Sequence, residues 1–318
     1  MQTIRYSLAR RPRWLNGREQ PTERAHPARQ NVAKRDTMAI GTINLTDTAR
    51  AARATPGGDG IAVAATNIHK MYPAKHRNVQ AVGPLDVTIR HGEFVCLVGP
   101  SGCGKSTFLR MIAGLTQPSE GQLAVDVAAD AKQPISMVFQ DYGIYPWKTV
   151  AQNIRFGLDV AGYSRRESKA RVAEWVDRLQ LTGFENSYPN QLSGGMKQRV
   201  SIARALATEP ELLLMDEPFA ALDAQLREVL QDELLALWQA NRRTVVFVTH
   251  SLEEALILAD RVVVMGARPG RVVADIEVPF ERPRSGEARN TAEFGRLRAE
   301  LWALLKVELG DGGQGGAQ

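Results

Sequence analysis

The sequence predicts an α/β fold built on a mainly parallel sheet, with a helical subdomain inserted into it. Short apolar runs, bounded by polar residues or glycine, alternate along the chain with stretches of helix-forming composition. Runs of this kind are typical of strands buried on both faces of a parallel sheet, with helices as the crossover connections. Between two of these runs, residues 141–207 are mostly helix-forming, which indicates the inserted subdomain.

The expected strands and helices follow one another in a regular order. The expected strands are Phe94–Val98, Ile135–Phe139, Leu212–Met215, Thr244–Val248 and Val262–Met265. The expected helices are Ser106–Leu115, Met196–Ala207, Ala224–Asn241 and Leu252–Ala259. Because each of these helices follows one of the strands, the order supports crossover connections on a single sheet.

The carboxyl end of the chain predicts one further helix and a tail. Apolar residues recur there every three or four positions, which predicts an amphipathic helix within residues 284–309. These apolar residues are Phe294, Leu297, Leu301 and Leu305. Residues 310–318 are rich in glycine, and we expect them to form a flexible tail.

The amino-terminal residues 1–60 differ from the rest in composition. They are rich in Arg, Ala, Thr and Gly without sustained periodicity, so we expect a disordered basic extension. Residues 1–37 hold nine basic and three acidic residues, a charge of +6, which leaves −1 for residues 38–318 of a chain carrying +5. The extension could bind an anionic membrane surface, or it could be solvated and precede a true start at Met38. Prolines among its arginines favour the second interpretation.

Charge and composition also exclude several classes of protein. With the basic extension set aside, the body is nearly neutral, so a nucleic-acid partner is not expected. The two cysteines, Cys96 and Cys103, are too few for a disulfide scaffold and indicate a reducing compartment. Since no apolar run approaches the roughly 20 residues of a membrane span, we expect no transmembrane part.

A glycine-rich segment lies between a predicted strand and a predicted helix and fits the phosphate-loop pattern G-x-x-x-x-G-K-[ST]. Its glycines let backbone N–H groups converge on phosphate oxygens, and the helix N-terminus adds positive charge. We expect Lys105 to neutralise phosphate charge and the Ser106 hydroxyl to ligate Mg²⁺. The residues expected to bind a nucleotide here are Gly99, Pro100, Ser101, Gly102, Cys103, Gly104, Lys105, Ser106 and Thr107.

Two carboxylates follow a second predicted strand, since Leu212–Met215 leads directly into Asp216 and Glu217. An Asp at this place matches the second Mg²⁺ ligand of phosphate-loop nucleotidases. Glu217, one residue further, is placed to orient and deprotonate an attacking water molecule. Many strands end in acidic residues, so this pattern becomes specific only together with the phosphate loop.

A second anion-binding turn precedes the predicted helix Met196–Ala207. The turn is Ser193, Gly194 and Gly195, which combine a hydroxyl group, exposed N–H groups and a helix N-terminus. One nucleotide does not need two phosphate cradles in the same subunit. We therefore expect this turn to bind, in trans, a nucleotide held by a partner subunit.

Over about residues 62–283, these motifs resemble the ATP-binding domain of ABC transporters, a P-loop nucleotidase core with an antiparallel β edge. The resemblance implies roles for four more residues, which stand in the family order. Gln140 would ligate Mg²⁺ and report nucleotide occupancy, and the switch histidine His250 would contact the γ-phosphate. Tyr72 would stack on adenine. Asp223, in the loop that crosses a dimer interface, would be one of the nucleotide-binding residues. The residues implied in catalysis are Glu217, His250, Gln140 and Lys105, and the implied metal ligands are Ser106, Gln140 and Asp216.

Within that family, residues 138–150, 192–199 and 259–271 resemble importers of nitrate, aliphatic sulfonates and taurine. The resemblance implies an ATP-hydrolysing subunit that uses ATP and Mg²⁺ and lies peripherally on the cytoplasmic face of the inner membrane. The implied partners are a second copy in a head-to-tail dimer, a transmembrane permease and, indirectly, an extracytoplasmic binding protein. Two alternatives remain open: the ATPase subunit of an exporter or lipid transporter, and a soluble ABC ATPase without a transport function.

Overall fold

The computed structural model describes residues 60–74, 78–128, 131–282, 284 and 286–311. All of them fall in one compact unit of the chain, and a second unit, Arg5–Arg53, lies outside the described residues. The expected disorder of residues 1–59 and flexibility of residues 312–318 also concern positions outside the description and stay predictions. No described helix has both the length and the apolar content that crossing a membrane requires.

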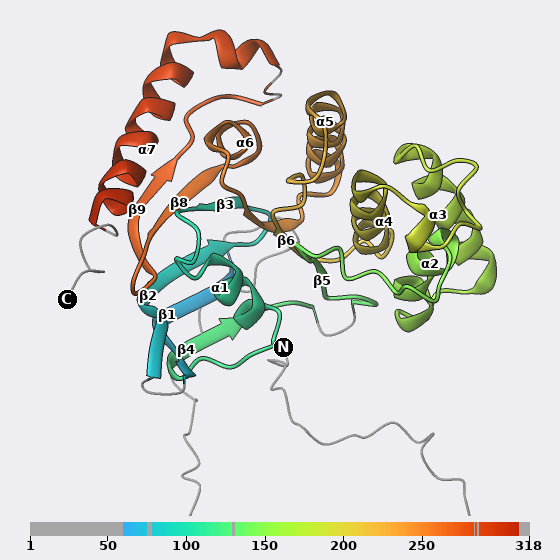
Figure 1. Cartoon of the computed structure of the whole chain (residues 1–318), viewed down its shortest axis with the longest axis horizontal. Helices are drawn as coiled ribbons and strands as arrows, with labels where there is room; N and C mark the ends of the chain where they lie inside the picture. Colours follow the sequence, from blue (N-terminus) through green and yellow to red (C-terminus); the bar gives the residue numbers. More distant parts are fainter. Residues whose placement is uncertain (1–59, 75–77, 129–130, 283, 285, 312–318) are drawn as a thin grey trace, which may run out of the picture. The chain divides into compact units, whose positions relative to one another are not determined.

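The predicted sheet is present and has six strands in the order β5-β6-β7-β3-β8-β9. Figure 1 labels each of these strands except β7. The first five strands of that order pair in parallel, and β9 pairs with β8 in the antiparallel sense. The strands are β3 (Phe94–Val98), β5 (Ile135–Val138), β6 (Leu212–Asp216), β7 (Thr244–Val248), β8 (Arg261–Gly266) and β9 (Arg271–Glu277). All five predicted strands are confirmed, and the mainly parallel sheet with them.

A second, antiparallel sheet has the order β2-β1-β4. Its strands are β1 (Ile61–Pro73), β2 (Asn78–Arg90) and β4 (Glu120–Val125). The antiparallel edge was expected from the resemblance alone, and no apolar run predicted where its strands lie. In β2, buried and exposed residues alternate over residues 84–90, whereas the burial pattern of β1 is irregular and the β1–β2 register shifts four times. The alternation that would mark these strands in the sequence is therefore interrupted.

The two faces of the six-stranded sheet pack against different layers. In β3, Val95 and Leu97 belong to a core shared with the antiparallel sheet and with α1 (Lys105–Ile112). Phe94 and Cys96 point to the other face, where the core is shared with the remaining helices. Burying each large side chain in such a core contributes about 1.5–3 kcal/mol relative to exposure. These two cores hold the strand ends, and the loops after them, in fixed places.

The inserted subdomain contains α2 (Val150–Val160), α3 (Arg165–Arg178), a 3₁₀ turn at Pro189–Gln191 and α4 (Gly194–Leu206). Both α2 and α3 begin with a capping box, in which a Thr or Ser oxygen accepts the N–H three residues on. Three more helices follow in the chain: α5 (Ala224–Asn241), α6 (Leu252–Leu258) and α7 (Ala292–Asp311).

The C-terminal helix begins later than the expected residue 284. A separate 3₁₀ turn, Gly286–Asn290, precedes α7, and the Thr291 hydroxyl oxygen accepts the N–H of Phe294 at 3.2 Å. Threonine is a good helix N-cap, so the helix starts where this bond can form. The predicted apolar side is buried at Phe294, Leu301 and Leu305, and α7 continues to Asp311, into the expected tail.

Candidate functional site

Neighbouring parallel strands end at the same edge of the six-stranded sheet, and the predicted site residues follow them directly. Gln140 lies two residues after β5, and Glu217 directly follows β6. His250 lies two residues after β7, and the phosphate loop begins directly after β3. Because carboxyl ends of parallel strands share one edge, the sheet order brings segments far apart in sequence together.

The phosphate loop needs its glycines for two separate reasons. Gly102 and Gly104 have φ of 77° and 96°, a left-handed conformation that side chains rarely adopt. At Gly104 a Cβ atom would also lie 2.6 Å from Cγ2 of Val82. At Gly99 it would lie 2.4 Å from the carbonyl oxygen of Met265, so the backbone packs too closely for any side chain. The loop therefore keeps its curved shape only with glycine at these positions.

Lys105 begins α1, and its side chain folds back into the curve of the loop. Its Nζ donates to the carbonyl oxygens of Gly99 at 2.7 Å and Pro100 at 3.0 Å. Only 6% of the residue is exposed. The third contact is the buried Cys103 sulfur at 3.7 Å, and burial raises the pKa of that thiol. The loop therefore holds a buried ammonium charge beside the N–H groups that a phosphate would approach.

Ser106 and Asp216 meet across the site, although 110 positions separate them in the chain. The Ser106 hydroxyl donates to Oδ1 of Asp216 at 2.8 Å, while Oδ2 of Asp216 is buried without a hydrogen bond. Mg²⁺ prefers hard oxygen ligands and is usually held by one or two carboxylates plus substrate phosphates. The unpaired oxygen fits that ion. Among the described residues, no three His, Cys, Asp or Glu side chains form a group that could hold a metal without a phosphate.

Replacing Asp216 by Asn is expected to stabilise the nucleotide-free protein. Burial raises the pKa of this carboxyl above its ordinary 3.8. The folded state therefore binds the proton more tightly than the unfolded state, and the stability that Asp216 contributes is lost as pH rises through the raised pKa. The Tm of Asp216→Asn should exceed that of the parent at pH values above the ordinary carboxyl pKa of 3.8, by a margin that grows until pH passes the raised pKa of Asp216. Calorimetry without nucleotide or metal measures it; exposed Asp232→Asn is the control, and equal Tm values throughout would contradict the assignment.

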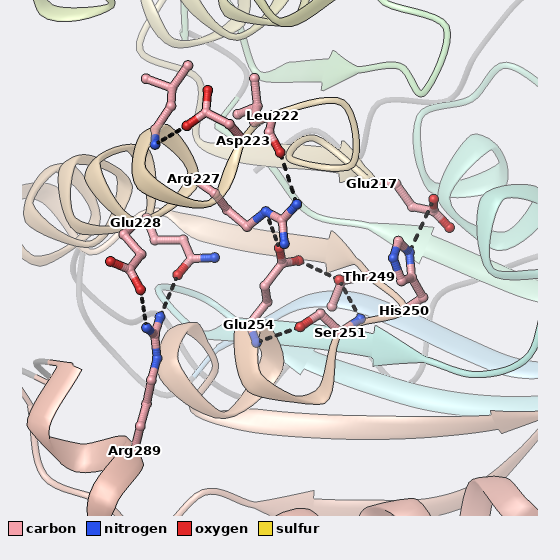
Figure 2. Close-up of polar contacts among 12 residues, drawn as sticks. Glu217, Leu222, Asp223, Arg227, Glu228, Thr249, His250, Ser251, Glu254 and Arg289 are labelled. Atoms are coloured by element: carbon pink, nitrogen blue, oxygen red, sulfur yellow. Dashed lines mark hydrogen bonds and ion pairs between the residues drawn. The ribbon is translucent and has the colours of Figure 1, made fainter.

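The Glu217 carboxylate contacts two side chains from neighbouring strand ends: Gln140, which follows β5, and His250, which follows β7. Its Oε2 accepts a hydrogen bond from Nε2 of Gln140 at 3.4 Å. The same oxygen lies 3.5 Å from Nδ1 of His250, a contact that Figure 2 shows. Glu217 itself has a left-handed φ of 49°, and its N–H donates to the carbonyl oxygen of Val248 at 3.0 Å. A carboxylate in this setting can accept a proton, and the amide and imidazole beside it can orient what it acts on.

The remaining predicted residues do not reach this cluster. Ser193 caps α4, its Oγ accepting the N–H of Met196 at 3.3 Å, and Asp223 caps α5 by accepting from Leu226 at 3.0 Å. Tyr72 is exposed, with Nζ of Lys70 5.2 Å from its ring centre. Among the described residues, no hydrogen bond or ion pair connects the Ser193–Gly195 turn or Tyr72 to the phosphate loop. Within one chain, these groups are separate from the hydrolytic cluster.

One residue beside the site was missed by the sequence reasoning. Glu254 is buried in α6, close behind His250, and its Oε2 accepts a hydrogen bond from Thr249. The only signal in the sequence was its spacing from Ser251, since a serine followed three residues later by glutamate marks a helix start. That pattern indicates a cap and says nothing of burial.

Comparison with protein families finds a match to the ABC transporter model over residues 82–220. An ABC transporter ATP-binding protein of Methanocaldococcus jannaschii is 46% identical over 246 residues, 76% of this chain and 91% of the relative. An aliphatic sulfonates import ATP-binding protein of Bacillus cereus is 40% identical, covering 78% and 96%. A nitrate import ATP-binding protein of Synechocystis is 41% identical, covering 76% and 94%.

Comparison with solved structures finds the same architecture. A dimeric ATP-binding cassette in a post-hydrolysis state, bound to ADP and phosphate, superposes with a TM-score of 0.63. Its sequence is 33% identical to this chain, and the match covers 69% of this chain and all of the other. The solved fold therefore spans the described core.

Proposed function

This chain belongs to the ABC transporter family as an ATP-binding subunit with ATPase activity, and we propose that it drives an importer of a small oxyanion. The observation that carries the proposal is the cluster of the phosphate loop, Asp216, Glu217, Gln140 and His250 at one sheet edge. The names of the sulfonate and nitrate relatives support the direction of transport and the class of cargo.

In the proposed reaction, the loop amides and Lys105 bind the β- and γ-phosphates of ATP, with Lys105 exchanging its carbonyl partners for phosphate oxygens. Ser106, Asp216 and Gln140 are the side chains that would hold Mg²⁺. When bound, Mg²⁺ neutralises charge on the phosphate oxygens. Tyr72 would stack on the adenine ring.

Glu217 is proposed as the general base. Its carboxylate accepts a proton from a water molecule, which then attacks the γ-phosphorus, and ADP leaves with the bridging oxygen. Gln140 donates to Glu217 and His250 lies beside it, so both can hold the carboxylate in place. Their other polar groups would contact the metal ion and the γ-phosphate. A general base accelerates the reaction only when it is held at a fixed distance from the water molecule. We assign that positioning role to the contacts of Glu217 with Gln140 and His250.

The site is proposed to be completed by a second copy of the chain. Among the described residues, Ser193, Gly194 and Gly195 make no hydrogen bond to the phosphate loop of their own chain, yet they form a helix start that can bind an anion. In a head-to-tail dimer they would reach the γ-phosphate held by the other copy, with Asp223 at the interface. A transmembrane permease would join the dimer on the cytoplasmic face of the inner membrane, and an extracytoplasmic binding protein would deliver the cargo to the permease.

Growth on limiting cargo tests the importer proposal. A strain without the gene is expected to grow poorly on nitrate, taurine or an alkanesulfonate as sole nitrogen or sulfur source. The parental gene should restore growth, whereas Glu217→Gln should not, because transport needs turnover. Glu211→Gln, at the opposite end of β6, is the matched control and should restore growth. Normal growth of the deletion strain on all three compounds would contradict the assigned class of cargo.

A further inference from the structure

A buried carboxylate next to the site has no part in the reaction proposed above. Glu254 is 7% exposed, and its Oε2 accepts a hydrogen bond of 2.5 Å from the hydroxyl group of Thr249. Burial raises the pKa of the Glu254 carboxyl. Burying a carboxylate costs stability unless hydrogen bonds and charged partners replace its contacts with water. The partners of Glu254 therefore indicate its role.

The second oxygen of Glu254 faces an arginine from a different helix. Nε of Arg227, on α5, lies 3.6 Å from Oε1 of Glu254 (Figure 2). The same guanidinium donates through Nη2 to the carbonyl oxygen of Leu222 at 3.0 Å. Glu254 and Arg227 therefore form a bridge between the segment before α6 and the segment before α5.

Both ends of this bridge lead to residues of the proposed mechanism. Thr249 directly precedes His250, whose Nδ1 lies 3.5 Å from Glu217. Leu222 directly precedes Asp223, the cap of α5. The pair therefore contacts the residue directly before His250, through the Thr249 hydroxyl group, and the residue directly before Asp223, through the Leu222 carbonyl oxygen. Figure 2 shows the continuous series of contacts from Leu222 through Arg227, Glu254 and Thr249.

We propose that Glu254 and Arg227 are a positioning pair that holds His250 against Glu217 and couples this arrangement to the segment at Asp223. The pair touches no reacting atom, and its importance rests on the proposed function of His250 and Asp223. If Asp223 is displaced at the interface, Arg227 transmits the displacement through Glu254 to the His250 segment. The two segments therefore change position together.

Steady-state kinetics of the full chain with MgATP tests the proposal. Glu254→Gln keeps an acceptor for Thr249 but loses the charge that faces Arg227, and Arg227→Met keeps the stem but loses the guanidinium. Each variant is expected to lower kcat about tenfold, because a small displacement of His250 from Glu217 lowers the rate of the chemical step. The KM for ATP should change less than about twofold, since the phosphate loop is untouched.

The double variant distinguishes a positioning pair from two independent residues. If the two residues act as one unit, Glu254→Gln with Arg227→Met should be no slower than either single variant. Independent effects would multiply to about a hundredfold and would overturn the proposal. A lower Tm with unchanged kcat per folded molecule would also overturn it, because that outcome indicates a structural role. Should Glu254→Gln fail to fold, the more exposed Arg227→Met still tests the kcat prediction.

Two neighbouring residues provide matched controls. Glu253→Gln and Glu228→Gln remove exposed carboxylates one position away, which pair with Arg298 and Arg289 instead. Both controls are expected to keep the parental kcat. If Glu217→Gln hydrolyses ATP normally, the proposed function is at fault. If Glu217→Gln is inactive while Glu254→Gln and Arg227→Met are normal, only the positioning pair is refuted.

Discussion

Glu217→Gln is expected to lower kcat for ATP hydrolysis by about 10²- to 10⁴-fold while ATP binding stays at the parental affinity. The amide that replaces the carboxylate cannot accept a proton from water at neutral pH. Every group proposed to bind phosphate remains, because Lys105 and Ser106 contact the loop and Asp216 rather than Glu217. Phosphate release at saturating MgATP, together with equilibrium binding of ATP, measures the two properties separately.

Glu211→Gln is the control for that experiment. Glu211 lies just before β6, and its Oε2 accepts the N–H of Ala128 at 2.6 Å, a bond that a glutamine oxygen can also accept. This variant should hydrolyse ATP at the parental rate. If Glu217→Gln does so as well, Glu217 is not the base, whatever its contacts with Gln140 and His250.

Lys105→Ala is expected to act on binding instead of turnover. The ammonium group is buried in the loop and would face phosphate charge directly, so removing it should cost about 2 kcal/mol or more, roughly 30-fold in Kd. Calorimetric titration with ATP in the presence of Mg²⁺ measures the loss. Lys105→Ala also removes the hydrogen bonds from Nζ to the carbonyl oxygens of Gly99 and Pro100. A thermal unfolding curve checks that the variant remains folded without them.

Lys169→Ala is the control for the lysine, since Lys169 is exposed on α3 and pairs with no carboxylate among the described residues. Its removal changes the net charge equally and should leave the Kd for ATP unchanged. Equal affinities for Lys105→Ala and Lys169→Ala would mean that the buried ammonium does not bind the nucleotide.

The strands of the central sheet could be predicted because both of their faces are buried. In β3 and β7 all five residues are buried, so the sequence shows an unbroken apolar run with clear ends. The strand-end motifs could be predicted for the same reason, since the end of each run marks the residue that reaches the sheet edge. Fold class and ABC family are both confirmed.

Other features depend on contacts that no local pattern contains. In β1 the burial pattern is irregular, and its pairing with β2 is interrupted by register shifts, so β1 has no clean period of two. The link between Ser106 and Asp216 was inferred only from the motifs, whereas the unpaired Oδ2 of Asp216 is visible only in three dimensions. Glu254 looks like a solvated residue of a first helical turn until α5 is packed over it.

The molecular mass of Glu217→Gln in solution tests most directly whether a second copy completes the site. The variant should hold ATP without consuming it, so light scattering in MgATP is predicted to give twice the 35.0 kDa of one chain. In MgADP, or without nucleotide, the same protein should have the mass of one chain, because no γ-phosphate is present for Ser193 of the other copy to bind. The same single-chain mass in MgATP and in MgADP would contradict the account.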